Sequence, residues 1–167
     1  MATIYLGLGS NLGDRAAHIK KALQWLESQV ELTAVSPIYE TEPLGIKEQP
    51  WFLNAVCAGQ TALTPQALLE FVKGIEKRMG RTQTIRFGPR PIDIDILFYD
   101  DLVLETPTLQ LPHPRLTRRA FVLVPLTQIA PRLVHPLSGR TIQEILAHAG
   151  ELEEVRLVEP SPPPHSS

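Results

Sequence analysis

The sequence feature that most constrains the fold is the alternation of apolar and acidic residues in Ile92-Asp93-Ile94-Asp95-Ile96-Leu97. A period of two is typical of a β-strand with one buried face, because successive side chains point to opposite sides of a strand. The isoleucines are therefore expected to face the core. Asp93 and Asp95 then share the other face, with Cα atoms roughly 6–7 Å apart. Neighbouring carboxylates repel each other unless a cation lies between them, and Mg²⁺ favours carboxylates together with phosphate oxygens, so the strand indicates a metal–phosphate site.

Basic residues flank the acidic strand on both sides. Arg81, Arg86 and Arg90 precede it in a loop that also contains glycine and proline, and His113 and Arg119 follow it. Guanidinium groups bind phosphate oxygens through paired hydrogen bonds. For the arginines that precede the strand, a solvated loop is the alternative interpretation. For residues 111–119 the alternative is a polar turn before a helix, which is as well supported as a phosphate cradle that includes His113 and Arg119. The acidic pair and the preceding arginines together favour the metal–phosphate site.

An aromatic and an amide side chain lie two residues apart at the start of an apolar segment. Phe52 and Asn54 would share one face of a strand over residues 52–61. Together they are suited to contact a flat heterocycle, and plain burial in the core is the alternative for Phe52.

The glycine-rich segment Gly7-Leu8-Gly9-Ser10-Asn11-Leu12-Gly13 matches neither common nucleotide-binding template. It lacks the Gly-Lys-Ser/Thr ending of a P-loop, and its third glycine falls one position late for a dinucleotide fingerprint. These glycines are therefore interpreted as turn and helix-packing residues.

The order of periodic segments predicts an α+β fold. Strands are expected over residues 3–9, 31–40, 52–61 and the Ile-Asp stretch, and helices capped by Asp14 and Thr64 lie between them. The resulting βαββαβ order is ferredoxin-like, a largely antiparallel sheet with helices packed on one face. Pro37 interrupts the second strand, which is therefore expected to be an edge or bulged strand.

The rest of the chain is expected to form a C-terminal extension of the same domain. A short strand is predicted near residues 102–104, a helical stretch over residues 121–128, and a helix opened by a Thr141–Glu144 capping box. Residues 1–158 are expected to be a single domain. Residues 159–167 contain no side chain able to fill a core and are expected to be a disordered tail.

The composition excludes several functional classes. The 167 residues carry a net charge of −2, so no general basic field attracts nucleic acid or an anionic membrane. The N-terminus lacks the cationic start of a secretory signal, and no apolar run is long enough to span a bilayer, so a cytoplasmic protein is expected. The single cysteine, Cys57, lies in an apolar run and is interpreted as a buried structural thiol. No segment indicates a protein partner.

Five motifs, in order, resemble the 6-hydroxymethyl-7,8-dihydropterin pyrophosphokinase family over roughly residues 2–158. They are Gly9-Ser10-Asn11-Leu12-Gly13, Tyr39-x-Thr41-x-Pro43-Leu44-Gly45, Gln49-Pro50-x-Phe52-Leu53-Asn54, Arg86-x-Gly88-Pro89-Arg90-x-x-Asp93-Ile94-Asp95-Ile96-Leu97 and Leu111-Pro112-His113-Pro114. The resemblance implies transfer of the β,γ-diphosphate of ATP to the hydroxymethyl oxygen of 6-hydroxymethyl-7,8-dihydropterin, with release of AMP. This reaction is a step of folate biosynthesis.

The resemblance also implies roles for individual residues. Asp93 and Asp95 would hold two Mg²⁺ ions against the triphosphate, and Arg81 and Arg90 would steady the transferring group. The implied pterin contacts are Thr41, Glu42, Pro43, Leu44, Phe52, Asn54 and Phe121. The implied nucleotide contacts are Glu76, Arg86, Arg90, Ile96, His113 and Arg119.

Two other functions compete with this one. A non-catalytic ferredoxin-like nucleotide- or RNA-binding module would be expected to show aromatic residues on its central strands and a basic face. A metal-dependent nuclease would need further acidic residues near the aspartate pair. Neither pattern is present in the sequence, so the transferase is favoured.

Overall fold

The segments with a period of two form one antiparallel sheet. The computed structural model describes residues 1–41, 51–80, 91–150, 152 and 154–160. The strands are β1 (Ala2–Ser10), β2 (Val30–Val35), β3 (Ile38–Thr41), β4 (Phe52–Thr61), β5 (Asp93–Tyr99) and β8 (Val155–Glu159). Their order is β5-β1-β4-β3-β8, with β2 also paired to β4. The four strands of the βαββαβ core are β1, the interrupted second strand (β2 and β3), β4 and β5. They pair in the order expected for a ferredoxin-like sheet, which confirms the predicted fold class.

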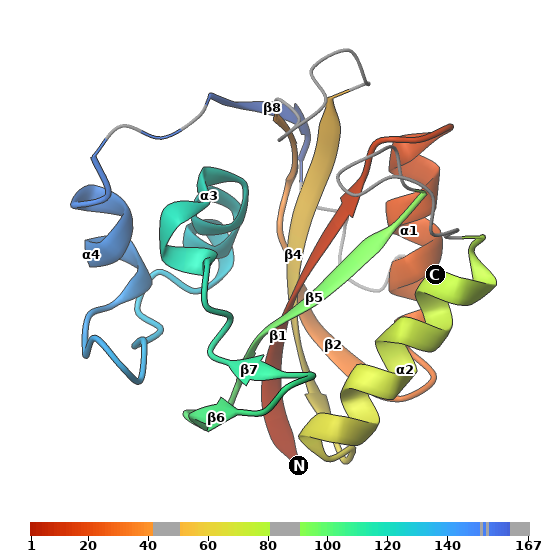
Figure 1. Cartoon of the computed structure of the whole chain (residues 1–167). Coiled ribbons are helices and arrows are strands. Elements are labelled where there is room, and N and C mark those ends of the chain that lie inside the picture. The colour runs from red at the N-terminus through yellow and green to blue at the C-terminus, as the bar shows by residue number, and fades with distance from the viewer. Residues whose placement is uncertain (42–50, 81–90, 151, 153, 161–167) are drawn as a thin grey trace.

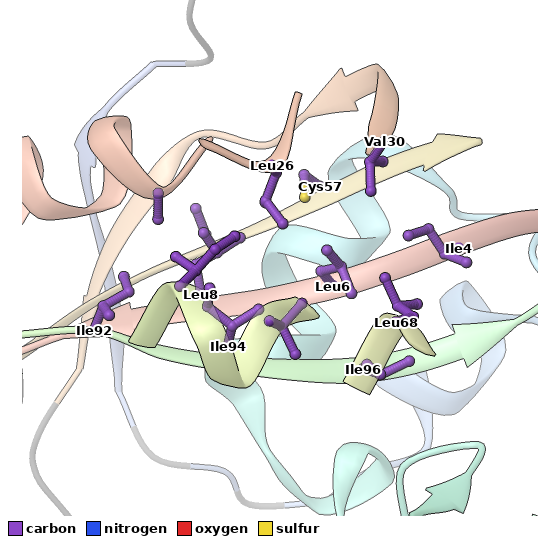
Figure 2. Packing of buried hydrophobic residues seen from close by; sticks show 14 of the residues in the cluster. Ile4, Leu6, Leu8, Leu26, Val30, Cys57, Leu68, Ile92, Ile94 and Ile96 are labelled. Atoms are coloured by element: carbon purple, nitrogen blue, oxygen red, sulfur yellow. The ribbon is translucent and has the colours of Figure 1, made fainter. Parts of the chain in front are cut away.

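Two helices pack on one face of the sheet, α1 (Arg15–Leu26) and α2 (Pro65–Arg78) (Figure 1). Each begins at the predicted cap, because the Asp14 carboxylate and the Thr64 hydroxyl accept hydrogen bonds from backbone N–H groups of the first turn. Figure 2 shows the core between these helices and the sheet, to which Ile92, Ile94 and Ile96 all contribute. The isoleucines are at most 4% exposed, so the alternation in this strand is confirmed.

The C-terminal extension covers the opposite face of the sheet. It contains the 3₁₀ helix η1 (Leu116–Arg118), α3 (Ala120–Ile129), α4 (Ile142–Ala147) and a small hairpin of β6 (Leu104–Glu105) and β7 (Gln110–Leu111). Figure 1 shows α3 and α4 on the side of the sheet away from α1 and α2. A second apolar core forms there, and the predicted Thr141–Glu144 capping box opens α4. The two helices of the βαββαβ core therefore lie on one face, as predicted, and the helices of the extension cover the other.

A bulge in β5 supplies both cores from one strand. Tyr5 pairs with Phe98 and Leu6 with Ile96, so Leu97 is the extra residue. The bulge turns Leu97 and Phe98 both towards the second core, while Ile96 remains in the first.

The predicted second strand consists of two strands separated at Ser36 and Pro37. The Ser36 hydroxyl accepts a hydrogen bond from the Val56 N–H at 2.9 Å, so this buried donor of β4 keeps a partner at the break. β2 lies at an edge of the sheet, but β3 is paired on its other side with β8 and is not an edge strand.

Strand β8 extends one residue into the segment that was predicted to be a tail. Glu159 is the last residue of β8, where it pairs with Ile38 and its carboxylate lies 3.1 Å from the Lys20 ammonium. The hydrogen bonds along β3 order this segment although its side chains are largely exposed. Residues 161–167 lie outside the described part of the chain. Within that part, no helix combines the length and apolarity needed to cross a membrane.

Replacement of Thr64 by alanine tests the cap of α2. The hydroxyl accepts a hydrogen bond from the Ala67 N–H at 3.2 Å, and alanine leaves this donor without its protein partner. We expect the free energy of unfolding in urea to fall by about 1 kcal/mol. Thr64→Ser keeps the acceptor and should behave nearly as the parent protein. Equal stability of the alanine and serine variants would contradict the assigned cap.

Candidate active site

A cavity of about 390 Å³ opens on the face of the sheet that carries α3. It lies at the C-terminal end of β1 and the N-terminal ends of β4 and β5. Its lining includes two glycines of β1, Gly7 and Gly9, and side chains from β3, β4, β5, α2, α3 and the segment that precedes η1. The cavity therefore brings together residues that are far apart in the sequence.

The two glycines of β1 separate an acidic side of the cavity from an amide side. Gly9 pairs with Asp93 of β5 on one side and with Asn54 of β4 on the other. Gly7 pairs with Asp95 of β5 and with Val56 of β4. Two strand spacings put the Cα atoms of Asp93 and Asn54 roughly 10 Å apart. Since glycine has no side chain, the space between the carboxylates and the amide remains open.

The space around Gly9 leaves little room for a side chain. A Cβ atom there would lie 3.0 Å from Oδ1 of Asn54 and 3.5 Å from Cδ1 of Phe52. The predicted turn and helix-packing role is therefore wrong for Gly7 and Gly9, which lie in a strand and line the cavity. Gly13, with φ +68°, does occupy the left-handed conformation suited to glycine.

The acidic side of the cavity has the composition of a magnesium site. Asp93 and Asp95 are half-buried and both line the cavity. Among the described residues, no group of three His, Cys, Asp or Glu side chains could hold a metal ion. A pair of carboxylates leaves most coordination positions to water and phosphate oxygens, which is the arrangement that Mg²⁺ prefers. The residues present therefore fit Mg²⁺ bound together with a phosphate-bearing substrate.

Glu76 connects α2 to the acidic strand. Its carboxylate accepts a hydrogen bond from the Ile94 N–H at 2.8 Å and lies 3.4 Å from the Lys73 ammonium. β5 is the last strand of the sheet, so Glu76 provides a partner for a backbone donor at the sheet edge. Glu76 is 3% exposed and lines the cavity.

His113 is held as a neutral imidazole. Its Nδ1 accepts a hydrogen bond from the Arg115 N–H at 3.2 Å, which leaves Nε2 as the protonated nitrogen. Burial lowers the pKa of His113; the Asp95 carboxylate opposes this shift, and the Arg119 and Arg115 guanidinium groups add to it. His113 therefore contributes a neutral N–H donor near neutral pH, while the two arginines contribute positive charge.

The amide side of the cavity presents flat and polar surfaces. The Asn54 Nδ2 donates a hydrogen bond to the Thr41 hydroxyl at 2.8 Å, and both side chains are buried. This bond fixes the amide orientation. Phe52 lies on the same strand, and Phe121 contributes a second ring from α3, with the Arg119 guanidinium 5.3 Å from its centroid. Such a wall suits a planar heterocycle with hydrogen-bonding groups on its edge.

The structure brings together most of the described residues that were predicted to form the site. Those that line the cavity are Thr41, Phe52, Asn54, Glu76, Asp93, Asp95, His113, Arg119 and Phe121. Ile96 is 4% exposed in the core on the other face and does not line the cavity. Predicted residues outside the described part of the chain are Glu42, Pro43, Leu44, Arg81, Arg86 and Arg90.

Sequence reasoning missed several residues of the cavity lining, among them Gly7, Gly9, Lys73 and Arg115. Gly7 and Gly9 can be recognised as cavity residues only once the strand register is known, because the register places them beside the aspartates and the asparagine. Lys73 precedes Glu76 by three positions on one helix face. Arg115, which was not among the predicted site residues, lines the cavity close to His113 in the sequence.

The fold and the cavity define an α+β domain with a paired-carboxylate, arginine-rich site beside a binding wall for a heterocycle. Residues 5–131 match the model of the 7,8-dihydro-6-hydroxymethylpterin-pyrophosphokinase (HPPK) family. The chain belongs to this family, as its motifs predicted.

Similar proteins include two bacterial pyrophosphokinases of comparable length. The chain is 46% identical over 144 residues to the 2-amino-4-hydroxy-6-hydroxymethyldihydropteridine pyrophosphokinase of Aquifex aeolicus, covering 86% of this chain and 90% of the relative. It is 47% identical over 149 residues to the enzyme of the same name from Methylorubrum extorquens, covering 88% and 93%. The folic acid synthesis protein FOL1 of Dictyostelium discoideum is 41% identical, and the match spans 96% of this chain and 24% of that protein.

The fold also resembles a solved structure. The wild-type HPPK-DHPS chain of Plasmodium falciparum with STZ-DHP superposes with a TM-score of 0.70 at 18% identity, covering 87% of this chain and 43% of that chain. At this level of identity the likeness supports the fold alone.

Gly9→Ala should impair the site without unfolding the protein. The new methyl group would crowd Asn54 and Phe52 from the open face of the sheet. We expect kcat/KM for the pterin and ATP to fall at least about 10-fold, since small displacements of binding groups are costly. Gly74→Ala is the matched control, because its Cβ meets nothing within 4 Å on α2. Parental activity of Gly9→Ala in a steady-state assay would contradict the role assigned to this glycine.

Cys57 should be inert in the folded protein. It is 1% exposed, and burial raises the pKa of its thiol to about 12. The thiol therefore stays protonated near pH 8, where only the thiolate reacts. We expect no reaction with a thiol-specific chromogenic disulfide in buffer and one equivalent of reaction in denaturing urea. Rapid labelling of the native protein would show that β4 does not bury this residue.

Proposed function

We propose that this chain transfers the β,γ-diphosphate of ATP to the hydroxymethyl oxygen of 6-hydroxymethyl-7,8-dihydropterin, a step of folate biosynthesis. The products are AMP and the pterin diphosphate. Family membership supports the reaction, as do the names of the bacterial relatives, which the chain covers almost completely. The alternative of a non-catalytic RNA-binding or nucleotide-binding module is not supported by these relatives.

One structural observation carries the proposal. The aspartates of β5 and the Phe52–Asn54 pair of β4 lie on the same face of the sheet, on either side of Gly7 and Gly9. A metal-bound polyphosphate and a flat heterocycle would therefore meet within one cavity. This is the arrangement that transfer between two bound substrates requires, because it replaces a collision in solution by a fixed orientation.

Asp93 and Asp95 would hold Mg²⁺, with two ions expected from the family resemblance. When bound, Mg²⁺ neutralises charge on the triphosphate oxygens and favours displacement at phosphorus. The carboxylates fit this role because they share the cavity face and leave other coordination positions to the nucleotide.

The remaining side chains have positioning and electrostatic roles. The Nε2–H of His113 and the guanidinium group of Arg119 would bind phosphate oxygens during the transfer. The bond that breaks joins the β-phosphorus to the oxygen that bridges it to the α-phosphorus. The motif resemblance assigns Arg81 and Arg90 to the same task. Such transfers need little covalent help from the protein, so orientation and charge neutralisation carry most of the catalysis.

The pterin would bind at the amide side of the cavity. The amide orientation fixed by Thr41 presents Asn54 to the hydrogen-bonding edge of the ring, and Phe52 and Phe121 would contact its faces. The resemblance adds Glu42, Pro43 and Leu44 to these contacts and places Glu76, Arg86 and Ile96 near the nucleoside. The described part of the structure contributes Glu76 to the cavity and Ile96 to the core.

The identity of the nucleotide product tests the reaction. The protein is incubated with ATP, Mg²⁺ and 6-hydroxymethyl-7,8-dihydropterin, and the nucleotides are separated by anion-exchange chromatography. We expect AMP to form in proportion to pterin diphosphate, and no AMP to form without the pterin. Release of ADP or inorganic phosphate instead would contradict diphosphate transfer.

Asp95→Ala tests the metal assignment. Removal of one carboxylate should lower kcat at least about 100-fold, because charge stabilisation in a site of this kind is worth several kcal/mol. The fold should be retained, since Asp95 lies on the cavity face and outside both apolar cores. Asp101→Ala, which removes an exposed carboxylate from a turn, is the control and should keep full activity. Near-normal turnover of Asp95→Ala would show that the metal is held elsewhere.

A further inference from the structure

Four residues from separate segments interact next to the pterin side of the cavity. The Glu40 carboxylate lies 2.9 Å from Nη1 of Arg15 and 2.7 Å from Nη2 of Arg156. The same Nη1 of Arg15 donates to the Trp51 carbonyl oxygen at 2.6 Å, and the Arg156 guanidinium lies 4.3 Å from the centroid of the Trp51 ring. We call Arg15, Glu40, Trp51 and Arg156 the rear clamp. It joins the start of α1, the end of β3, the start of β4 and strand β8.

The Glu40 side chain lies on the face of the sheet opposite to the cavity. Glu40 pairs with Leu53 across β3 and β4, and cross-strand partners point to the same face. Leu53 belongs to the core under α1 and α2. Thr41 pairs with Phe52, and both line the cavity on the other face. The rear clamp is therefore not a substrate contact.

The rear clamp holds the backbone that carries the pterin contacts. Glu40 directly precedes Thr41, and Trp51 directly precedes Phe52, so each side of the strand pair is fixed one residue from a cavity side chain. Thr41 in turn orients the Asn54 amide through its hydroxyl. A shift of either strand would move these groups together.

Stability alone does not account for this arrangement. The Arg156 side chain is 52% exposed, and ion pairs of such exposure contribute little to folding because water screens them. Arg15 is the first residue of α1, where the helix dipole disfavours a positive charge. An arginine in this position and a carboxylate shared between two guanidinium groups point to a need for fixed geometry.

We propose that Arg15, Glu40 and Arg156 are positioning residues for the pterin substrate and not for ATP. The inference rests on the proposed function. The aspartates that would face ATP lie on β5, separated from β3 by β1 and β4. Loosening the rear clamp should therefore disturb the pterin side of the cavity and leave the nucleotide side in place.

Glu40→Gln tests the proposal by steady-state kinetics. We expect the KM for the pterin to rise roughly 5-fold or more, since small displacements of binding groups are costly. The KM for ATP should stay within about 2-fold of the parent value, because uniform binding of that substrate is unchanged. Arg156→Gln should give the same split. Arg156→Lys keeps the charge but loses the planar contact with Trp51. Its KM for the pterin should lie between that of the parent and that of Arg156→Gln.

A matched control separates this effect from a general loss of ion pairs. Lys20→Gln removes the Lys20–Glu159 pair, 3.1 Å long, which also joins α1 to β8 but does not involve Glu40. It should leave both KM values unchanged. Melting temperatures of all variants should fall by no more than about 2–4 °C, as expected for partly exposed ion pairs. A rise of both KM values together in Glu40→Gln would overturn the proposal.

Hydrogen exchange followed by mass spectrometry gives a readout independent of turnover. In Glu40→Gln, amide exchange should increase in peptides from residues 38–41 and 52–55 and stay at the parent level in residues 93–99. Unchanged exchange in the first two segments overturns the rear clamp, and increased exchange with an unchanged KM for the pterin overturns its positioning role. A parent protein that forms no AMP contradicts the proposed function and not the rear clamp.

In that case, pterin affinity is measured by fluorescence titration of the parent protein and of Glu40→Gln. Equal affinities of the two proteins for the pterin overturn the positioning role.

Discussion

The hydrogen-bond register of β1 with its two neighbours is the constraint on which the cavity depends. Gly9 lies between Asp93 of β5 and Asn54 of β4, and Gly7 lies between Asp95 of β5 and strand β4. A slip of one residue would turn the carboxylates into the apolar core and the isoleucines towards the cavity. The alternation of leucine and glycine in β1 prevents this, because burial of its leucines fixes which face carries the glycines. The same pattern therefore specifies both the core and the open space above it.

The two faces of the sheet divide the tasks of the molecule. The face under α1 and α2 is apolar and holds the larger core, whereas the face under α3 is apolar only at one end. At the other end of that face, polar and aromatic side chains surround the cavity. The bulge at Leu97 makes this division possible, since it turns two consecutive residues of β5 towards the second core just beyond the aspartates. One strand of the sheet therefore contributes both to a polar cavity and to an apolar core on the same face.

Local patterns accounted for much of this structure because they act over a few residues. The period of two in β5, the caps at Asp14 and Thr64 and the box at Thr141 were all predictable, since each depends on neighbours in sequence. The pairing of β3 with a C-terminal strand was not predictable in this way. Strand β8 has exposed side chains at Leu157 and Val158, so no periodic pattern marks it. The part played by Gly7 and Gly9 likewise required the register. Motif resemblance supplied what periodicity could not, namely which side chains meet in the cavity.

The covering of β3 by β8 has a consequence for biosynthesis. Glu40 and Arg156 are 116 positions apart, so the ribosome makes β3 long before its outer partner exists. Until then β3 offers an unpaired strand edge, the kind of surface through which nascent chains associate wrongly. Completion of the sheet must wait for nearly the last described segment of the chain. The strand that carries Arg156 of the rear clamp is therefore among the last of the described segments to be synthesised.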